Sequence, residues 1–280
     1  MIRIVTDSTC DLPKEWMKQY DIHVVPIHIQ FGADTFRDGE TIGPPEFYGR
    51  IEQDGMLPKT SQPPPGDFVE AYRALAAQAD EIISLHVTSK LSGTYDSARM
   101  AAEAVAERVK VHVFDSLAGS SILGYMCLEA ARMVEAGKGA PEILKRLETT
   151  RPQANIFFTL ANLKFAQMSG RVGRLQSALA SLLNVQPIVR LENGLLDMTE
   201  RVRTRKKAID RIIEMARERV GDRPVNLAVL HAQAADEAVE FLEEAKRALK
   251  CREGFVHDLA LSLAVHFGPG ALALATYPVE

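Results

Sequence analysis

The strongest constraint on the fold is the alternation, in the first half of the chain, of short β-rich runs with amphipathic helical stretches. This alternation is typical of a parallel sheet covered by helices. The expected strands are Ile2–Thr6, His23–Gln30, Glu81–Val87 and Val109–Phe114. The expected helices are Pro13–Tyr20, Pro44–Gln53, Gly66–Gln78, Ser92–Arg108, Ala118–Ala136 and Ala140–Arg151. The first half is therefore predicted to be an α/β domain.

The second half of the chain has a different rhythm, which begins with two β-rich runs around an Asn193-Gly194 pair. An Asn-Gly pair favours the primed turn of a β-hairpin. The expected elements are the strands Pro187–Leu191 and Leu195–Thr199, a basic helix Arg203–Arg219, a strand Val225–His231 and a helix Ala234–Leu249. This mixture predicts an α+β domain, and the helix break at Arg151-Pro152 predicts two domains, residues 1–152 and 153–280.

The last apolar stretch, Leu259–Val279, contains no acidic or basic side chain and is long enough for a membrane span. His266-Phe267-Gly268-Pro269-Gly270 interrupts its middle, so we expect two buried strands around a tight loop instead. The amino terminus, MIRIVTDST, lacks the basic start and long apolar stretch of a signal peptide. The sequence therefore predicts no stable membrane span, although transient contact with a membrane surface stays open.

Composition excludes several classes of protein. With 280 residues, 46% hydrophobic and 25% charged, the chain is long enough for two packed units and is not disordered or collagen-like. The formal net charge of −4 gives no electrostatic basis for nucleic acid as a partner. Cys10, Cys127 and Cys251 form no C-x-x-C pair, which argues against a zinc site or a disulfide framework. We therefore expect no metal, and a cytoplasmic location.

Small hydroxyl side chains follow three of the expected strands, in Asp7-Ser8-Thr9, in Thr88–Thr94 and in Asp115-Ser116. In an open parallel sheet these loops share the edge where the strands end and where ligands usually bind. Ser92-Gly93-Thr94 also opens a helix, whose free N–H groups and dipole can receive an anion. The alternative is that Ser92 only caps that helix.

Three further groups of residues are candidates for anion binding. Thr60 and Ser61 precede three consecutive prolines, which stiffen either a ligand loop or a plain linker into the helix at Asp67. His266, in an apolar segment, is either a core histidine or a hydrogen-bond donor to a carboxylate. The basic clusters, Arg171 with Arg174 and residues 201–207, are solvated surface or dock an acidic partner or a phosphate.

Motifs of common catalytic sites are absent from the sequence, which contains no G-x-x-x-x-G-K-[ST], no G-x-S-x-G and no H-E-x-x-H. Gly268-Pro269-Gly270 leaves too few residues after it for a dinucleotide-binding unit, so no cofactor is expected. The chain thus offers anion donors without an evident hydrolytic or phosphate-transfer apparatus.

With these residues in view, the chain resembles the DegV family of bacterial fatty-acid-binding proteins, including the binding subunits of fatty acid kinase. The resemblance runs from end to end. It rests on IVTDSTCDLP (Ile4–Pro13), TSQPPPGDF (Thr60–Phe68), LSGTYDSA (Leu91–Ala98), FDSLAGS (Phe114–Ser120), SGRVG (Ser169–Gly173), RTRKKA (Arg203–Ala208) and HFGPGALA (His266–Ala273).

The resemblance implies a two-domain fold that buries one long-chain fatty acid, such as palmitate, between its domains. It implies that the carboxylate contacts are Thr60, Ser61, Ser92, Gly93, Thr94 and His266. It also implies a separate ATP-dependent kinase subunit that makes acyl phosphate for phospholipid synthesis, with Arg171 and Arg203 as docking or phosphate contacts. Pro64 and Phe267 depart from the family, which commonly has serine and threonine there.

Three functions follow from these observations, of which the first is a non-catalytic carrier of one fatty acid. About fourteen buried methylenes contribute roughly 11 kcal/mol before the costs of association, so the tail supplies affinity and the polar contacts orient the head group. The second is a hydrolase or phosphotransferase that uses Ser92 or His266 on a small acyl or phosphorylated substrate. The third is a regulatory protein whose partner binding is independent of lipid.

Overall fold

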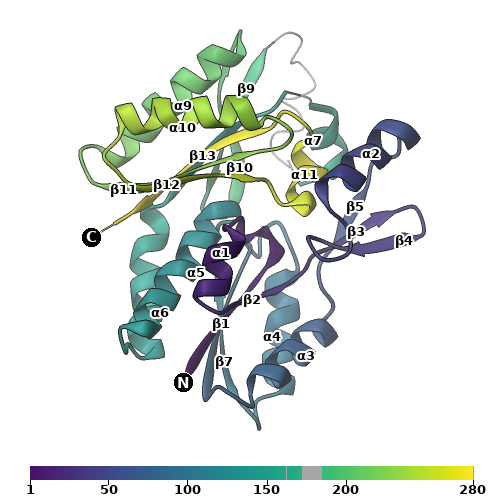
Figure 1. The fold of residues 1–280 in the computed structure, drawn as a ribbon, viewed down its shortest axis with the longest axis vertical. Coiled ribbons are helices and arrows are strands. Elements are labelled where there is room, and N and C mark those ends of the chain that lie inside the picture. The colour runs from purple at the N-terminus through teal and green to yellow at the C-terminus, as the bar shows by residue number, and fades with distance from the viewer. Residues whose placement is uncertain (162, 172–184, 280) are drawn as a thin grey trace. The chain divides into compact units, whose positions relative to one another are not determined.

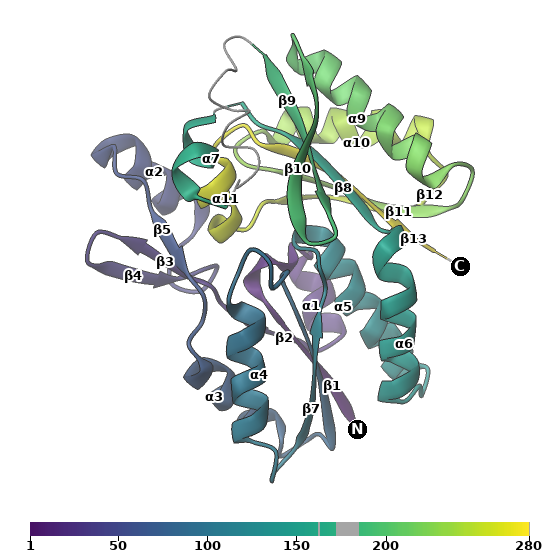
Figure 2. The ribbon, with the colours of Figure 1, turned by 180° about the vertical axis from the view of Figure 1, so that it is seen from behind.

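The computed structural model describes residues 1–161, 163–171 and 185–279, and the chain divides into two compact units. The first unit comprises Met1–Arg151 and a short return of the chain, Ala260–Ser262. The second comprises Pro152–Leu259 and Leu263–Glu280. Each unit contains its own central sheet, drawn in Figures 1 and 2 with the helices that cover it. The predicted α/β class, with a parallel sheet in the first half, is confirmed.

The central sheet of the first unit has the strand order β2-β1-β6-β7, and all of its pairings are parallel. Its strands are β1 (Ile2–Asp7), β2 (Ile22–Val25), β6 (Glu81–His86) and β7 (Lys110–Asp115). Since the strands are parallel, their carboxyl ends meet at one edge, as the pairs Asp7↔Val25 and His86↔Asp115 show. Three of the four predicted strands match these bounds within one residue.

Helices cover both faces of this parallel sheet, as their apolar spacing predicts. They are α1 (Lys14–Gln19), α3 (Pro65–Leu75), α4 (Thr94–Ala104), α5 (Ser120–Glu135) and α6 (Ala140–Thr150). Figures 1 and 2 show α3 and α4 on one side of the strands, with α5 and α6 on the other. On the α3–α4 side, Phe68, Tyr72 and Ala98 pack against Val5 and Ile82 in a continuous core.

A smaller antiparallel sheet, in the order β4-β3-β5, completes the first unit beside α2 (Pro44–Asp54). Its strands are β3 (His28–Phe31), β4 (Asp34–Arg37) and β5 (Lys59–Ser61). β5 is an edge strand, and its pairing with β3 sets Thr60 opposite Ile29 and Ser61 opposite His28. The two hydroxyl residues are therefore held in a fixed register and do not lie on a loose linker.

The second unit contains a six-stranded sheet in the order β10-β9-β8-β13-β11-β12. Its strands are β8 (Asn155–Thr159), β9 (Gln186–Glu192), β10 (Leu195–Val202), β11 (Val225–His231), β12 (Cys251–Asp258) and β13 (Leu272–Pro278). Among these described strands, β11 and β12 pair in parallel and the other neighbours pair antiparallel. The predicted hairpin joins β9 to β10, and the positive φ angles of Asn193 (50°) and Gly194 (79°) are those of a type I′ turn.

Two long helices, α9 (Arg205–Val220) and α10 (Ala235–Ala248), pack on one face of this sheet, where Ile212 and Phe241 join a core with Leu227 and Leu274. Figure 1 shows both helices on the same side of β11 and β13. The described residues also form two short helices, α7 (Leu163–Ser169) in the second unit and α11 (Leu261–Phe267), whose first two residues belong to the first unit. α9 begins after Thr204, whose hydroxyl accepts the N–H of Lys207 at 3.3 Å, as expected of a threonine N-cap.

One predicted strand, His23–Gln30, is wrong as a single element. The chain forms β2 in the parallel sheet and then β3 in the small antiparallel sheet, with Pro26-Ile27 between them. Proline has no N–H to contribute to a strand ladder, so it separates the two strands. A continuous apolar run therefore serves two different sheets.

The prediction of two strands within Leu259–Val279 is also wrong in its first half. Leu261–Phe267 forms α11, and only Leu272–Pro278 forms a strand, β13. Two distant side chains bind the start of this helix. Asp11 accepts a hydrogen bond from the backbone N–H of Ala260, and Asp38 accepts one from the backbone N–H of Ser262. A short apolar run without charges does not reveal such distant caps. Among the described residues, no helix is both long and apolar enough to span a bilayer.

Candidate functional site

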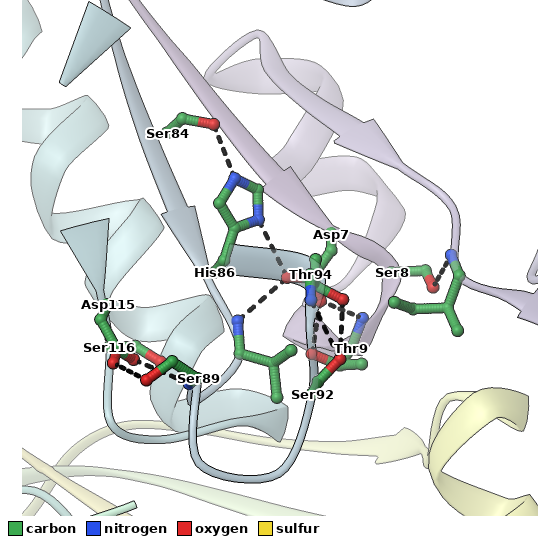
Figure 3. A network of polar contacts seen from close by, with 12 residues as sticks. Asp7, Ser8, Thr9, Ser84, His86, Ser89, Ser92, Thr94, Asp115 and Ser116 are labelled. Atoms are coloured by element: carbon green, nitrogen blue, oxygen red, sulfur yellow. Dashed lines mark hydrogen bonds and ion pairs between the residues drawn. The ribbon is translucent and has the colours of Figure 1, made fainter. Parts of the chain in front are cut away.

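The candidate site lies where the strands of the parallel sheet end, as the hydroxyl-rich loops predict. β1 runs into the 3-10 turn Ser8–Cys10, β6 runs into the loop before α4, and β7 runs into the loop before α5. Figure 3 shows the polar side chains of these three segments gathered at this edge. The register places the last residues of β1, β6 and β7 beside one another. The sheet topology thus assembles a polar surface from distant parts of the sequence.

The loop before α4 presents two hydroxyl groups that bond to each other. Ser92 Oγ and Thr94 Oγ1 are 2.8 Å apart, and Ser92 Oγ also accepts the N–H of Thr94 at 3.3 Å. Gly93 occupies the cap position of α4, and no side chain caps the helix there. Ser92 is half-buried and Thr94 is buried. Ser92 is therefore not the N-cap residue, and its hydroxyl forms a pair that can turn toward an anion.

The second pair of predicted hydroxyl residues, Thr60 and Ser61, lies next to this loop. The link is Gln62, which directly follows β5: a Cβ atom on Gly93 would lie only 2.5 Å from Gln62 Nε2. Thr60 and Ser61 are both half-buried. The structure thus places the end of the Gln62 side chain, which follows Thr60 and Ser61 in the chain, against Gly93 in the Ser92–Thr94 loop.

His266 lies in the second unit, in the last turn of α11, and it is half-buried. Burial, together with the positive charge of Arg171, lowers the pKa of His266 to about 4. The imidazole is therefore neutral at pH 7, with one nitrogen able to donate and the other able to accept. The following glycine, Gly268, has a φ of 74°, and a Cβ there would lie 2.4 Å from Phe165. The turn after His266 thus needs glycine for both reasons.

The two basic candidates also lie in the second unit. Arg171 is exposed and donates from Nη1 to the carbonyl oxygen of Ser169 at 3.0 Å. Arg203 is exposed between β10 and α9. Arg174 lies outside the described residues. Arg171 therefore has an electrostatic link to His266, whereas Arg203 is placed only as a surface cation.

The two departures from the family pattern have different surroundings. Pro64 is exposed at the start of α3, where its φ of −65° suits the residue before a helix. Phe267 packs its ring 4.9 Å from the ring of Phe158, in a tilted arrangement. The aromatic side chain at position 267 is thus used for packing within the second unit.

A buried polar chain beneath the strand ends was not predicted as a unit. Asp7 Oδ2 lies 3.0 Å from His86 Nδ1, His86 Nε2 lies 2.7 Å from Ser84 Oγ, and Ser84 Oγ lies 2.8 Å from Tyr72 Oη. Asp7 also accepts the N–H and hydroxyl of Thr9 and the N–H of Val87. All four linked side chains have no exposed surface. The one available signal was the spacing of Ser84 and His86, which face the same side of β6.

These hydrogen-bonded side chains have the same order as an Asp-His-Ser catalytic triad, but they cannot act as one. The Ser84 hydroxyl is fully buried and is hydrogen-bonded to Tyr72 as well as to His86, so no substrate reaches it. Burial raises the pKa of the Tyr72 phenol, which keeps the far end of the chain neutral. We assign the network to holding β1, β6 and α3 together beneath the loops, and Figure 3 shows its part from Ser84 through His86 to Asp7.

Two further buried carboxyl groups lie beyond the end of β1 and were not singled out in the sequence. Asp11 accepts Ser120 Oγ at 2.5 Å and the N–H of Ala260 at 2.8 Å. Asp38 accepts Ser8 Oγ at 2.9 Å and the N–H of Ser262 at 3.1 Å. Burial raises the pKa of Asp11 to about 8 and also raises that of Asp38. These carboxyl groups bind the Ala260–Ser262 segment into the first unit.

In the described part of the chain, no cluster of three or more His, Cys, Asp or Glu side chains is arranged to hold a metal ion. The loops at these strand ends carry the hydroxyls of Ser92 and Thr94 and the exposed Lys90, and Gln62 lies against Gly93. Hydroxyl and amide groups can hold an anion by hydrogen bonds, and within the described residues the Ser92 hydroxyl bonds to Thr94 and not to a basic side chain.

Comparisons with known proteins give the same picture over the whole chain. The family model described as "Uncharacterised protein, DegV family" matches residues 1–279. The curated "Protein DegV" of Bacillus subtilis is 35% identical over 275 residues, which is 98% of each chain. A fatty-acid-binding DegV family protein of Thermus thermophilus and the fatty-acid-binding DegV of Bacillus subtilis have similar structures, with TM-scores of 0.93 and 0.91. Both are 34% identical to this chain, and each match covers 99% of both chains.

Proposed function

The chain belongs to the DegV family, and from this membership we propose that it binds one long-chain fatty acid and carries it without chemical change. The solved relatives from Thermus thermophilus and Bacillus subtilis, which match it over 99% of its length, are described as fatty-acid-binding. The observation that supports the proposal is the contact of Gln62, which directly follows Thr60 and Ser61, with Gly93 in the Ser92–Thr94 loop. We expect the neutral donors of these two segments to face the same ligand.

We assign the fatty acid carboxylate to the hydroxyls of Thr60, Ser61, Ser92 and Thr94, with Gly93 giving close backbone approach and His266 donating one further N–H. A neutral histidine fits this role, and the lowered pKa of His266 keeps it neutral at physiological pH. Hydrogen bonds from neutral groups to an ionised acceptor are stronger than those between neutral partners. The division of these residues between residues 1–152 and 153–280, with the acyl chain between the two domains, stays a prediction from the family resemblance.

The acyl chain supplies most of the binding energy in this proposal. A palmitate tail of about fourteen methylenes gains on the order of 11 kcal/mol on burial, before the costs of association and ordering. The head-group contacts then act mainly by rejecting ligands that lack a carboxylate. An ester or alcohol of the same length should therefore bind more weakly than the acid.

A separate ATP-dependent kinase subunit is the partner that we propose, in a reducing cytoplasm that suits the three free cysteines. Arg171 and Arg203 are exposed, so both side chains can reach an acidic or phosphate group on such a partner. The hydrolase and phosphotransferase alternatives gain no support from the geometry. The Ser92 hydroxyl bonds to Thr94 and not to a histidine, and the buried Ser84 is closed to substrates.

The first test is to extract purified protein under denaturing conditions and to identify the released lipid by mass spectrometry. Stoichiometric fatty acid in the extract, or saturable binding of added palmitate after delipidation, is the expected result. A protein that releases no fatty acid and binds neither palmitate nor oleate would end the proposal.

The second test measures the head-group residues with a matched control on the same loop. Ser92→Ala combined with His266→Ala should weaken palmitate binding by about tenfold or more, because two donors to the carboxylate are lost. Ser89→Ala is the control, since Ser89 is exposed and bonds to Asp115. Equal palmitate affinity in the double variant and the control would reject the assignment of these side chains.

A further inference from the structure

The side chain of Gln62 lies in close contact with Gly93, beside the hydroxyl residues of the candidate site. A Cβ atom built on Gly93 would lie 2.5 Å from Nε2, 2.8 Å from Cδ and 2.9 Å from Oε1 of Gln62. All three atoms of the carboxamide lie within 3 Å of that Cβ position, so the end of the Gln62 side chain is in close contact with Gly93. A Cβ atom at position 93 would require this side chain to move.

The backbone angles of Gly93 do not require glycine. Gly93 has φ −78° and ψ 5°, which other amino acids adopt without strain. An alanine there would fit the backbone but would displace the carboxamide of Gln62. Glycine at this position therefore allows the carboxamide to lie against the start of α4.

The carboxamide itself is not used by the fold. Within residues 1–161, 163–171 and 185–279, Gln62 has no hydrogen bond to any side chain or backbone group. Gln62 is exposed, so the two N–H donors of its carboxamide are accessible to solvent. A structural glutamine that links two segments would normally bond to one of them. Here the side chain supplies donors without a protein acceptor, between two segments that carry hydroxyl groups.

We infer that Gln62 is a further head-group-binding residue, whose carboxamide, in contact with Gly93, donates an N–H to the carboxylate that we assign to the neighbouring hydroxyls. The inference rests on the proposed function and adds a residue to it. Thr60 and Ser61 precede Gln62 directly, and Ser92 and Thr94 flank Gly93, so Gln62 connects the two segments to which we assign the carboxylate. The amide adds a donor that carries no charge and does not titrate.

The decisive variant is Gln62→Glu, which has the same size and shape but replaces the donor N–H group with a negative oxygen. If Gln62 binds the head group, this variant should weaken palmitate binding by about tenfold or more, because a donor is lost and a like charge is added. Binding of hexadecanol, which has the same chain length and no charge, should change by less than about twofold. Gln53→Glu on α2 is the control, since it adds the same charge at another exposed position.

A double-mutant cycle tests whether the contact between Gln62 and Gly93 matters for binding. Gly93→Ala alone should weaken palmitate binding, because the new Cβ displaces the carboxamide. In a Gln62→Ala background the same change should cost little, since nothing remains to be displaced. If Gly93→Ala weakens palmitate binding equally in both backgrounds, the contact between Gln62 and Gly93 has no role in binding.

The two proposals fail in different ways. If wild-type protein binds palmitate and Gln62→Glu binds it equally well, Gln62 is a solvated surface amide and only the further inference is wrong. If wild-type protein binds no fatty acid, the proposed function is wrong as well. Melting temperatures of all variants, measured in parallel, show that each compared protein is folded.

Discussion

Asp11 gives the sharpest prediction about stability, because the fold holds this carboxyl group in a protonated form. Asp11 is only 3% exposed, and it accepts Ser120 Oγ and the N–H of Ala260. Burial, with a smaller contribution from the negative charges of Asp38 and Asp7, raises its pKa from 3.8 to about 8 against the opposing effect of these hydrogen bonds. The folded protein therefore keeps a proton that the unfolded chain releases near pH 4.

The sign of the pH dependence follows from this difference. Between the unfolded and the folded pKa, the folded state binds one more proton, so the free energy of unfolding falls as the pH rises. One proton contributes a slope of at most about 1.4 kcal/mol per pH unit, so the loss between pH 5 and pH 7 is roughly 2–3 kcal/mol. Asp38, whose pKa is also raised by burial, acts in the same direction.

Asp11→Asn should remove most of the Asp11 contribution, because an amide has no buried charge to form. Asparagine also tolerates the left-handed backbone of this residue, which has φ 39°. We expect the variant to match the wild type within about 1 kcal/mol at pH 5 and to be more stable by roughly 2–4 kcal/mol at pH 8. Asp21→Asn is the matched control, since Asp21 has φ 49° but is exposed and ion-paired with Arg3.

The assay is urea unfolding from pH 5 to pH 8, followed by the fluorescence of Trp16, the single tryptophan of the chain. Trp16 lies on α1, so its signal reports on the first unit. The reasoning is refuted if Asp11→Asn and the wild type lose stability with the same slope, or if wild-type stability rises over this range.

Two other substitutions test the packing beneath the site. Gly124→Ala should lower the free energy of unfolding by about 1–3 kcal/mol, because its Cβ would lie 2.2 Å from the backbone oxygen of Cys10; an unchanged urea midpoint would contradict this close approach. Tyr72→Phe should cost about 1–2 kcal/mol, since Ser84 loses a buried partner, and equal unfolding curves for variant and wild type would show that the phenol bond is not needed.

The periodic pattern of the sequence predicts the parallel sheet and most of its helices. β1, β6 and β7 are runs of β-branched and apolar residues, each followed by a polar loop, and this local signal does not depend on distant contacts. The Asn193-Gly194 turn is equally local, because its φ angles are set by the two residues themselves. Such features can be read from a single segment.

The elements that the sequence did not reveal are those fixed by partners far along the chain. α11 begins where Asp11 and Asp38 receive N–H groups of residues more than two hundred positions later. An apolar segment of that length is compatible with either a strand or a helix until its caps are known. The split at Pro26 between β2 and β3 depends likewise on two sheets that the local pattern does not distinguish.

The candidate site shows the same limit at the level of single side chains. Ser92 and Thr94 were indicated by their place after a strand, and Thr60 and Ser61 by a stiff loop and the family resemblance. Gln62 lies in the same motif, but its significance depends on the missing Cβ of Gly93. A contact between an amide and a glycine leaves no mark on composition or periodicity, so only the fold reveals it.

An edge proposed to bind a carboxylate must also avoid repelling it, and two buried acids of the first unit are arranged accordingly. Asp7, the acid at the end of β1, has its charge surrounded by the donors of Thr9, Val87 and His86. Asp11, a few residues later, stays protonated up to about pH 8. Neither of these two acids therefore presents a free negative charge near neutral pH. Fatty acid affinity should consequently weaken on the alkaline side of pH 8, where Asp11 ionises, while hexadecanol affinity stays constant. Parallel decline of both ligands would trace the loss to unfolding and not to charge.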